Sequence, residues 1–248
     1  MNESILNILE RDYSNITEID YTSKNQLFSG YNKNGTKVFI KHYLIRPGKE
    51  SRDILSTENE LNCYDALADK LKLAHPLEYS HKDRYLVLPY FNYREVILNE
   101  STSDEIYSQL IDLQKVEKYE KVHEEKNIKQ KYLENLDRFF NAFPEYTSMK
   151  TNIRNIIRSI EEPSILVFNH GDFRKRNLVV DEDNTIQVID YEHVHMGDPM
   201  YDPACMWLSL WKYPEIQEDF FDKIRTNKYF KESSFWKYVL CSATYMIH

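Results

Sequence analysis

The segment that most constrains the fold is SILVFNHGDFRKRNLVVDEDNTIQVIDYEH, because it contains two short runs rich in β-branched residues around a turn sequence. The runs are LVV and TIQVID, and the Asp-Glu-Asp-Asn between them favours a turn. This pattern predicts a β-hairpin with polar residues at both outer ends. Since a hairpin folds back on itself, the residues that enter it and those that leave it are expected to lie side by side.

Three polar residues stand at these ends. Asp172 and Asn177 precede the hairpin and Asp190 closes it, so Asn177 and Asp190 can converge although 13 residues separate them. Carboxylate and amide oxygens suit Mg²⁺, which takes one or two carboxylates and leaves its other positions to water and phosphate. Asp172, offset by the loop, is placed to accept a proton from an attacking hydroxyl group.

The first 90 or so residues are dominated by strand patterns. ITEIDY, LFSGYN and TKVFIKHY read as strands, and Asn34-Gly35 between the last two favours a hairpin turn with positive φ at both residues. Apolar residues at helical spacing follow over 51–73, and RYLVLPYF then reads as a buried strand that ends at Pro89. From residue 100 onward the patterns are mainly helical, so we place a boundary near residues 89–93.

Composition limits the classes of protein that this chain can represent. Its 248 residues suffice for a sizeable core, and the three cysteines form no CxxC pair, which favours a reducing cytoplasm. Forty acidic residues against 32 lysines and arginines give a net charge of −8, which argues against a nucleic-acid partner and is compatible with a cationic substrate. The N-terminal residues are polar and acidic, unlike a signal peptide, and no apolar run reaches membrane-spanning length, so we expect no membrane partner. The sequence ends within an amphipathic pattern, so we expect the natural chain to continue.

The two polar segments resemble a known family. NHGDFRKRN followed by VIDYEH is similar to the catalytic loop and metal-binding strand of aminoglycoside phosphotransferases and choline kinases, and more distantly of protein kinases. DPMYDPA resembles the segment that follows the metal-binding aspartate in that family. The resemblance implies a two-lobed α+β fold of the protein-kinase type. A small β-rich nucleotide-binding lobe would span 1–91, and a larger, mainly helical catalytic and substrate-binding lobe would span 92–248.

This resemblance also implies a reaction, the transfer of the γ-phosphate of ATP or GTP to a hydroxyl group. Asp172 would be the catalytic base, and Asn177 and Asp190 would hold Mg²⁺. Arg174 falls where protein kinases keep a lysine near the γ-phosphate, so it is a candidate for stabilising charge. His170 and Asp202 would support the catalytic loop.

The resemblance implies nucleotide-binding residues in the first half as well. Lys41 stands in TKVFIKHY, from where the family's lysine reaches the α- and β-phosphates, and Glu60 is its expected partner, with Glu58 as the alternative. The end of RYLVLPYF is similar to the hinge that binds adenine through main-chain groups. The remaining candidates are the hinge residues Pro89 and Phe91, and Ser23 and Asn25 in a phosphate-covering loop that contains no glycine.

The acceptor is the least constrained part of this interpretation. We favour a cationic, aminoglycoside-type antibiotic because of the acidic balance of the helical half, with Glu192 and Asp198 as candidate substrate-binding residues. Glu215, Glu218 and Asp219 are either further acidic contacts or an exposed helix face. Choline, ethanolamine or another small metabolite, such as a sugar or a homoserine-like alcohol, is the alternative.

Two other classes remain open. A catalytically idle kinase-like binding module would keep the nucleotide pocket without turnover, although neither the candidate base nor a candidate metal ligand is missing here. A protein kinase is disfavoured because HGD replaces HRD and no APE-like segment follows Asp190. The sequence leaves the oligomeric state open.

Overall fold

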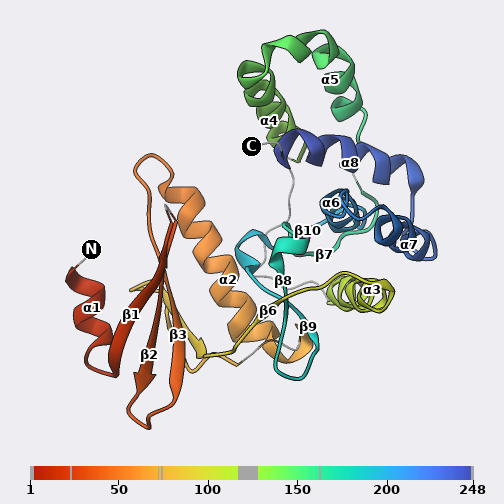
Figure 1. Cartoon of the computed structure of the whole chain (residues 1–248). Helices are drawn as coiled ribbons and strands as arrows, with labels where there is room; N and C mark the ends of the chain where they lie inside the picture. Colours follow the sequence, from red (N-terminus) through yellow and green to blue (C-terminus); the bar gives the residue numbers. More distant parts are fainter. Residues whose placement is uncertain are drawn as a thin grey trace. The chain divides into compact units, whose positions relative to one another are not determined.

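The computed structural model describes residues 3–22, 24–71, 73, 75–116, 128–161 and 163–246. The chain forms two compact units (Figure 1). The first comprises Met1–Arg94 together with the short segments Asp181–Thr185 and Asp190–His193, and the second comprises Glu95–Val180, Ile186–Ile189 and Val194–His248. The first unit thus combines one long N-terminal segment with two short pieces of the second half of the chain.

An antiparallel five-stranded sheet forms the first unit, with the strand order β1-β2-β3-β5-β4. Strand β4 was not expected from the sequence. Alternate residues of a strand point to opposite faces, so Ile40 and its neighbour Lys41 face different sides of the sheet. The strands are β1 (Tyr13–Tyr21), β2 (Asn25–Asn32), β3 (Lys37–Tyr43), β4 (Glu78–Ser80) and β5 (Tyr85–Pro89).

The turn between β2 and β3 differs in detail from the one expected. Gly35 has a φ of 77°, but Asn34 does not have a positive φ. The loop is closed instead by the Asn32 side chain, whose Oδ1 accepts hydrogen bonds of 3.0 Å from the backbone N–H groups of Asn34 and Thr36. The loop therefore has four residues rather than two. The reason is that the side chain of Asn32, which lies outside the Asn34-Gly35 pair, accepts hydrogen bonds from the loop backbone.

Two helices accompany this sheet, and Figure 1 shows them on its opposite sides. Helix α1 (Glu3–Leu9) was not expected, and its Ile5 and Leu9 pack into the apolar cluster formed by β2, β3 and β5. Helix α2 (Glu50–Leu71) forms where the periodicity predicted a helix. Its Ile54 and Leu55 are nevertheless exposed, whereas polar positions such as Glu60 are buried.

Helices dominate the second unit. Helix α3 packs on α7, α4 on α5 and α8, and α6 on α7 and α8. Within the described residues, no helix combines the length and the apolar character needed to cross a bilayer. The helices are α3 (Glu100–Gln114), α4 (Ile128–Ala142), α5 (Lys150–Arg158), α6 (Tyr201–Ser209), α7 (Pro214–Arg225) and α8 (Glu232–Met246), with a 3₁₀ segment, η1 (Pro144–Met149), before α5.

Short strands and 3₁₀ turns carry the segments singled out by the sequence. Strand β8 (Leu178–Val180) pairs with β9 (Ile186–Val188) in the antiparallel hairpin expected from the pattern. Strand β7 (Val167–Asn169) pairs with β10 (His195–Gly197). The 3₁₀ turn η2 (Lys175–Asn177) leads into β8, η3 (Tyr191–His193) follows β9, and β6 (Arg94–Glu95) joins the β8–β9 sheet at its edge.

We expect His42 to make the stability of the protein dependent on pH. Burial, assisted by Arg84, lowers the pKa of this histidine to about 4, and its Nδ1 lies 3.0 Å from Oε1 of Gln26. Between that value and the ordinary pKa the unfolded chain binds a proton that the folded chain does not, so stability falls as the pH falls. Between pH 7 and pH 5 the loss attributable to His42 should be about 1–2 kcal/mol.

Urea unfolding of the wild type and of His42→Asn at both pH values measures this contribution. The variant should lose less stability than the wild type over the same interval. Equal losses in the two proteins would contradict the assignment.

Candidate active site

The first unit holds Lys41 in β3, between the backbones of β2 and β5. Its Nζ donates to Oε2 of Glu60 at 2.6 Å and to Oδ1 of Asp190 at 2.8 Å. Glu58, the alternative partner, bonds instead to Nδ1 of His81 at 2.8 Å. The structure thus brings together three of the residues that the sequence singled out, from a strand, a helix and the end of the hairpin.

Lys41 and Glu60 are buried, whereas the side chain of Asp190 is 34% exposed, and the cluster contains more carboxylates than ammonium groups. Burial lowers the pKa of Lys41, but Glu60, Asp190 and Glu192 outweigh burial and raise it, so the side chain stays charged at neutral pH. Burial raises the pKa of Glu60 to about 7, in spite of the opposing effect of Lys41. Both pKa values move upward, that of Lys41 because of the neighbouring carboxylates and that of Glu60 mainly because of burial.

Glu192 contributes a second ion pair that the sequence did not reveal. Its Oε1 lies 2.7 Å from Nζ of Lys24 and 3.1 Å from Nε2 of His193. Burial alone would raise the pKa of Glu192, but His193, Lys41 and Lys24 hold it well below its usual range. Lys24 was missed because a single lysine in a short loop carries no periodic signal. Its position between the two loop candidates Ser23 and Asn25 was the available hint.

Two of the other nucleotide candidates, Asn25 and Pro89, lie at the ends of interior strands of the same sheet. Pro89 ends β5, and the ring of Phe91 lies 5.5 Å from that of Tyr93. Asn25 begins β2, and its backbone N–H donates to Oγ1 of Thr22 at 2.9 Å. Ser23 lies outside the described residues.

The second unit holds the catalytic-loop sequence in a backbone turn that Asp202 supports. The N–H groups of His170 and Gly171 donate to the two carboxylate oxygens of Asp202 at 2.6 and 3.0 Å. Gly171 has a φ of 80°, a conformation that is readily adopted by glycine. Burial raises the pKa of Asp202 to about 7, against the two N–H groups, which lower it.

The same turn is connected to the hairpin. Nε2 of His170 lies 3.0 Å from the carbonyl oxygen of Ile189, and the N–H of Ile189 donates to the carbonyl oxygen of Asn177 at 3.0 Å. Ile189 immediately precedes Asp190 in the chain. The loop and the closing strand of the hairpin are therefore bonded through His170 and Asn177.

Asp172 is buried among hydrogen-bond donors. Nδ2 of Asn177 donates to its Oδ2 at 2.9 Å, and Nη2 of Arg176 donates to the same oxygen at 2.8 Å, while Arg174 pairs with Oδ1. Burial would raise the pKa of Asp172, but the two arginines and His170 outweigh it and keep that pKa below its ordinary value. Asp172 is therefore ionised at neutral pH. Arg176 was not among the sequence candidates, although it belongs to the run Arg-Lys-Arg.

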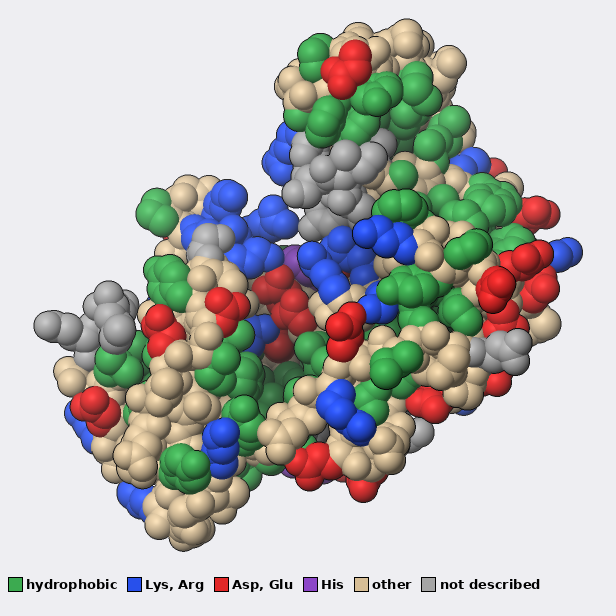
Figure 2. Space-filling view, in the orientation of Figure 1, with side chains coloured by type: hydrophobic (Ala, Val, Ile, Leu, Met, Phe, Trp, Pro, Cys, Tyr) green, Lys and Arg blue, Asp and Glu red, His purple; other side chains and the backbone are tan. Residues whose placement is uncertain are grey.

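The acidic residues named as possible substrate contacts have different surroundings. Asp198 is buried, and its Oδ1 accepts the N–H of Met200 at 2.8 Å, just before α6. Glu215 and Glu218 are exposed on α7, and Asp219 pairs with Lys223 at 2.6 Å. Figure 2 shows acidic side chains gathered over this helix. Asp198 thus bonds to the backbone, and α7 has an acidic outer face.

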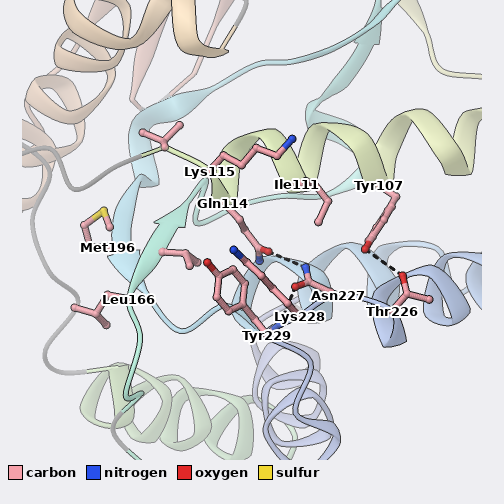
Figure 3. Close-up of a pocket in the computed structure, with 12 residues that line it drawn as sticks. Tyr107, Ile111, Gln114, Lys115, Leu166, Met196, Thr226, Asn227, Lys228 and Tyr229 are labelled. Carbon is pink, nitrogen blue, oxygen red and sulfur yellow. Dashed lines mark hydrogen bonds between the residues drawn. The ribbon is translucent and has the colours of Figure 1, made fainter.

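A pocket of about 750 Å³ lies elsewhere in the second unit, between α3 and the loop that joins α7 to α8 (Figure 3). Nε2 of Gln114 donates to the carbonyl oxygen of Pro199 at 2.7 Å, and Nδ2 of Asn227 donates to Oε1 of Gln114 at 2.8 Å. Gln114 thus links α3 to both the segment before α6 and the loop after α7.

No group of three or more histidine, cysteine, aspartate or glutamate side chains in the described part of the chain is arranged to hold a metal ion. A site built from one amide and one carboxylate would not form such a group. The Asn177 amide and the Asp190 carboxylate offer the hard oxygen ligands that Mg²⁺ prefers.

Comparisons with known proteins agree on the family and the fold. The model of the phosphotransferase enzyme family matches residues 41–235, whereas no curated protein sequence matches significantly. Spectinomycin phosphotransferase APH(9)-Ia, solved with ADP and spectinomycin, gives a TM-score of 0.68 at 12% identity, over 98% of this chain and 84% of that one.

Two further solved structures have comparable similarity. Choline kinase LicA from Streptococcus pneumoniae gives a TM-score of 0.67 at 15% identity, over 98% of this chain and 86% of that one. A macrolide 2'-phosphotransferase of type I gives 0.69 at 12% identity, over 98% and 89%. The α+β fold of the protein-kinase type, with a β-rich first part and a helical second part, is thereby confirmed.

We expect Asp202→Ala to destabilise the protein by at least about 2 kcal/mol, because it leaves the buried N–H groups of His170 and Gly171 without an acceptor. Thermal or urea unfolding measures the change. Asp222→Ala, at an exposed position of α7, is the control and should change stability by less than about 0.5 kcal/mol. A stable Asp202→Ala protein would show that the loop is held by other contacts.

Proposed function

The chain belongs to the phosphotransferase enzyme family, and we propose that it transfers the γ-phosphoryl group of ATP or GTP to a hydroxyl group of a small molecule. The observation that carries the proposal is the buried Lys41, held at 2.6 Å from Glu60 and 2.8 Å from Asp190. A buried ammonium group is unfavourable unless it is paired, and the two carboxylates hold Lys41 in one position, which supports a role in binding a polyphosphate.

Nucleotide binding rests on the first unit. Lys41 binds the α- and β-phosphates, with Glu60 holding the ammonium in position. The carbonyl group of Pro89 and the N–H of Phe91 bind the edge of the base, which suits either purine because main-chain groups offer one acceptor and one donor. Asn25 contributes to the segment that covers the phosphates, and Ser23 is a further candidate from the sequence.

Asn177 and Asp190 are the residues that would hold Mg²⁺. Their oxygen donors fit this ion, and Nδ2 of Asn177 is already bonded to Asp172, so Oδ1 is the amide's ligand atom. When bound, the ion supplies positive charge to the phosphate oxygens. Asp190 has a φ of 71°, which is rare for a residue other than glycine and typical of strained functional positions.

Asp172 orients the acceptor hydroxyl and takes its proton as the oxygen–phosphorus bond forms. The bond between the γ-phosphorus and its bridging oxygen breaks, and the nucleoside diphosphate leaves. Arg174 lies against Asp172 and stabilises charge on the transferring group. His170 and Asp202 hold the backbone of the loop, so most of the rate enhancement comes from positioning and electrostatics.

The acceptor class is the open part of this function. An aminoglycoside-type antibiotic and choline or ethanolamine are candidates because the phosphotransferase with spectinomycin and the choline kinase share the fold. Another small alcohol is the third candidate, and a kinase-like module without turnover is the alternative of another class. Glu192 and Asp198 remain substrate-binding candidates. The three buried cysteine thiols are consistent with a reaction in the cytoplasm.

Replacing Asp172 tests whether this residue is the catalytic base. Turnover by the wild type that is lost in the variants would exclude a kinase-like module without activity. Asp172→Asn and Asp172→Ala should lower kcat by about 10²–10⁴-fold while nucleotide binding persists, because the side chain acts on the acceptor. The measurement is nucleoside diphosphate release with a panel of antibiotics, choline and small alcohols. Asp183→Asn, in the exposed hairpin turn, is the control. Full activity of the Asp172 variants would refute this mechanism.

Removal of the metal gives a second test. Chelation of divalent ions should abolish transfer and added Mg²⁺ should restore it, with Asn177→Ala requiring a higher Mg²⁺ concentration than the wild type. Asn152→Ala, at an exposed position of α5, should behave like the wild type. An unchanged Mg²⁺ requirement in Asn177→Ala would remove this residue from the metal site.

A further inference from the structure

Lys24 lies in the loop between β1 and β2, and the proposed reaction gives this lysine no role. Its backbone N–H donates to Oγ1 of Thr22 at 3.2 Å, just after the end of β1. Its carbonyl oxygen accepts the N–H of Leu44, just after the end of β3, at 2.7 Å. The backbone of Lys24 is therefore bonded to the ends of two strands, which fixes the point from which its side chain extends.

The side chain of Lys24 reaches the segment that carries the proposed metal ligand. Its Nζ lies 2.7 Å from Oε1 of Glu192, which follows Asp190 by two residues. Lys41 of β3 binds Asp190 itself at 2.8 Å. Two ion pairs thus connect the sheet with residues 190–193, one from a strand and one from the loop before β2.

The exposure of the Lys24–Glu192 pair bears on what Glu192 can bind. The side chain of Glu192 is 7% exposed, and that of Lys24 is 32% exposed. Nε2 of His193 lies 3.1 Å from the same oxygen, Oε1, that Lys24 contacts. Little of this carboxylate is left for an acceptor molecule to contact. A role for Glu192 within the protein is therefore favoured over a contact with the acceptor.

We infer that Lys24 and Glu192 are positioning residues for the nucleotide, and that their ion pair holds the loop between β1 and β2 beside Asp190. The inference rests on the proposed function, because that function makes this loop part of the segment that covers the phosphates. It requires no free charge on either residue, since the pair itself is the device. It also separates Glu192 from the acceptor, so the two possible roles of this residue predict different kinetics.

The size of the effect follows from the population of molecules in which the loop is held. If only that population binds the phosphates fully, the apparent Kd of the nucleotide rises by the inverse of its fraction. An ion pair with one buried partner is screened less than a surface pair, so its loss should leave the loop in place in only a minor part of the molecules. A nucleotide bound under a misplaced loop is also poorly aligned for transfer.

Titration with N-methylanthraniloyl-ATP and N-methylanthraniloyl-GTP in the presence of Mg²⁺ measures this effect without any acceptor. Lys24→Met removes the charge and should raise the Kd of the bound nucleotide about five- to tenfold. Lys24→Arg should stay within about twofold of the wild type, because a guanidinium group can still pair with Glu192. Lys33→Met is the matched control, since Lys33 of the same unit pairs with Asp12 at 2.5 Å on the surface and is 72% exposed.

A double-mutant cycle with Glu192→Gln assigns the effect to the pair. The double variant should have a Kd no higher than that of the weaker-binding single variant, because the second substitution has no pair left to break. KM for the nucleotide should rise with Kd, while KM for the most rapidly phosphorylated acceptor of the panel should stay within about twofold. The midpoint of thermal unfolding of Lys24→Met should move by less than about 4 °C, because the lysine is partly exposed.

An unchanged nucleotide Kd in Lys24→Met, additive effects in the cycle, or no rescue by Lys24→Arg would overturn the inference and leave the proposed function intact. A higher KM for the acceptor alone in Glu192→Gln would assign this residue to the acceptor instead. A larger fall of the unfolding midpoint would show that the pair serves the fold. A wild type that neither binds a nucleotide nor phosphorylates any acceptor would contradict the proposed function as well.

Discussion

The ion pairs of Lys41 are the interaction on which the first unit depends. A charged side chain buried against the face of a sheet is strongly unfavourable unless opposite charges lie next to it. Here those charges come from α2 and from the segment that follows β9, at positions 19 and 149 residues away in the chain. The strand, the helix and the hairpin must therefore be assembled together, and any element that shifts leaves a buried charge without its partner.

The second unit also buries polar groups that need a partner, but here these groups are neutral backbone N–H donors. The two N–H groups of a turn with left-handed Gly171 would be unsatisfied in the interior, and Asp202 accepts both. The carboxylate reaches them from the first turn of α6, so the helix fixes the position of the loop. The backbone of the loop thus fixes the position of Asp172, and the neighbouring arginines help to keep its carboxylate ionised.

Local sequence patterns predicted the elements that repeat or alternate. The β8–β9 hairpin, the strands around Lys41 and the extent of α2 follow from periodicity and turn residues, whereas the choice of Glu60 over Glu58 was implied by the family resemblance. Helix α1 was not predicted because seven residues with two buried apolar side chains give too short a pattern. The prediction that α2 buries an apolar face was partly wrong. A polar residue such as Glu60 is buried there because it has a buried partner, Lys41.

Contacts between distant segments escaped prediction for a different reason. Lys24 meets Glu192 across 168 residues, and Asn227 meets Gln114 across 113, and neither pairing leaves a mark on its local sequence. Arg176 was visible as part of a charged run, but a charged run is usually a solvated surface. Only its place beside Asp172 distinguishes it from the other arginines.

The composition of the first unit also has a consequence for biosynthesis. Residues 190–193 belong to this unit, and Asp190 and Glu192 neutralise lysines in β3 and in the loop before β2. A nascent chain that has emerged only as far as Arg94 contains the sheet and α2, but it lacks both carboxylates. Domains generally fold as units, beginning with the N-terminal part during synthesis. In this chain the N-terminal unit becomes complete only after residue 193 has left the ribosome, so its final packing must await most of the polypeptide.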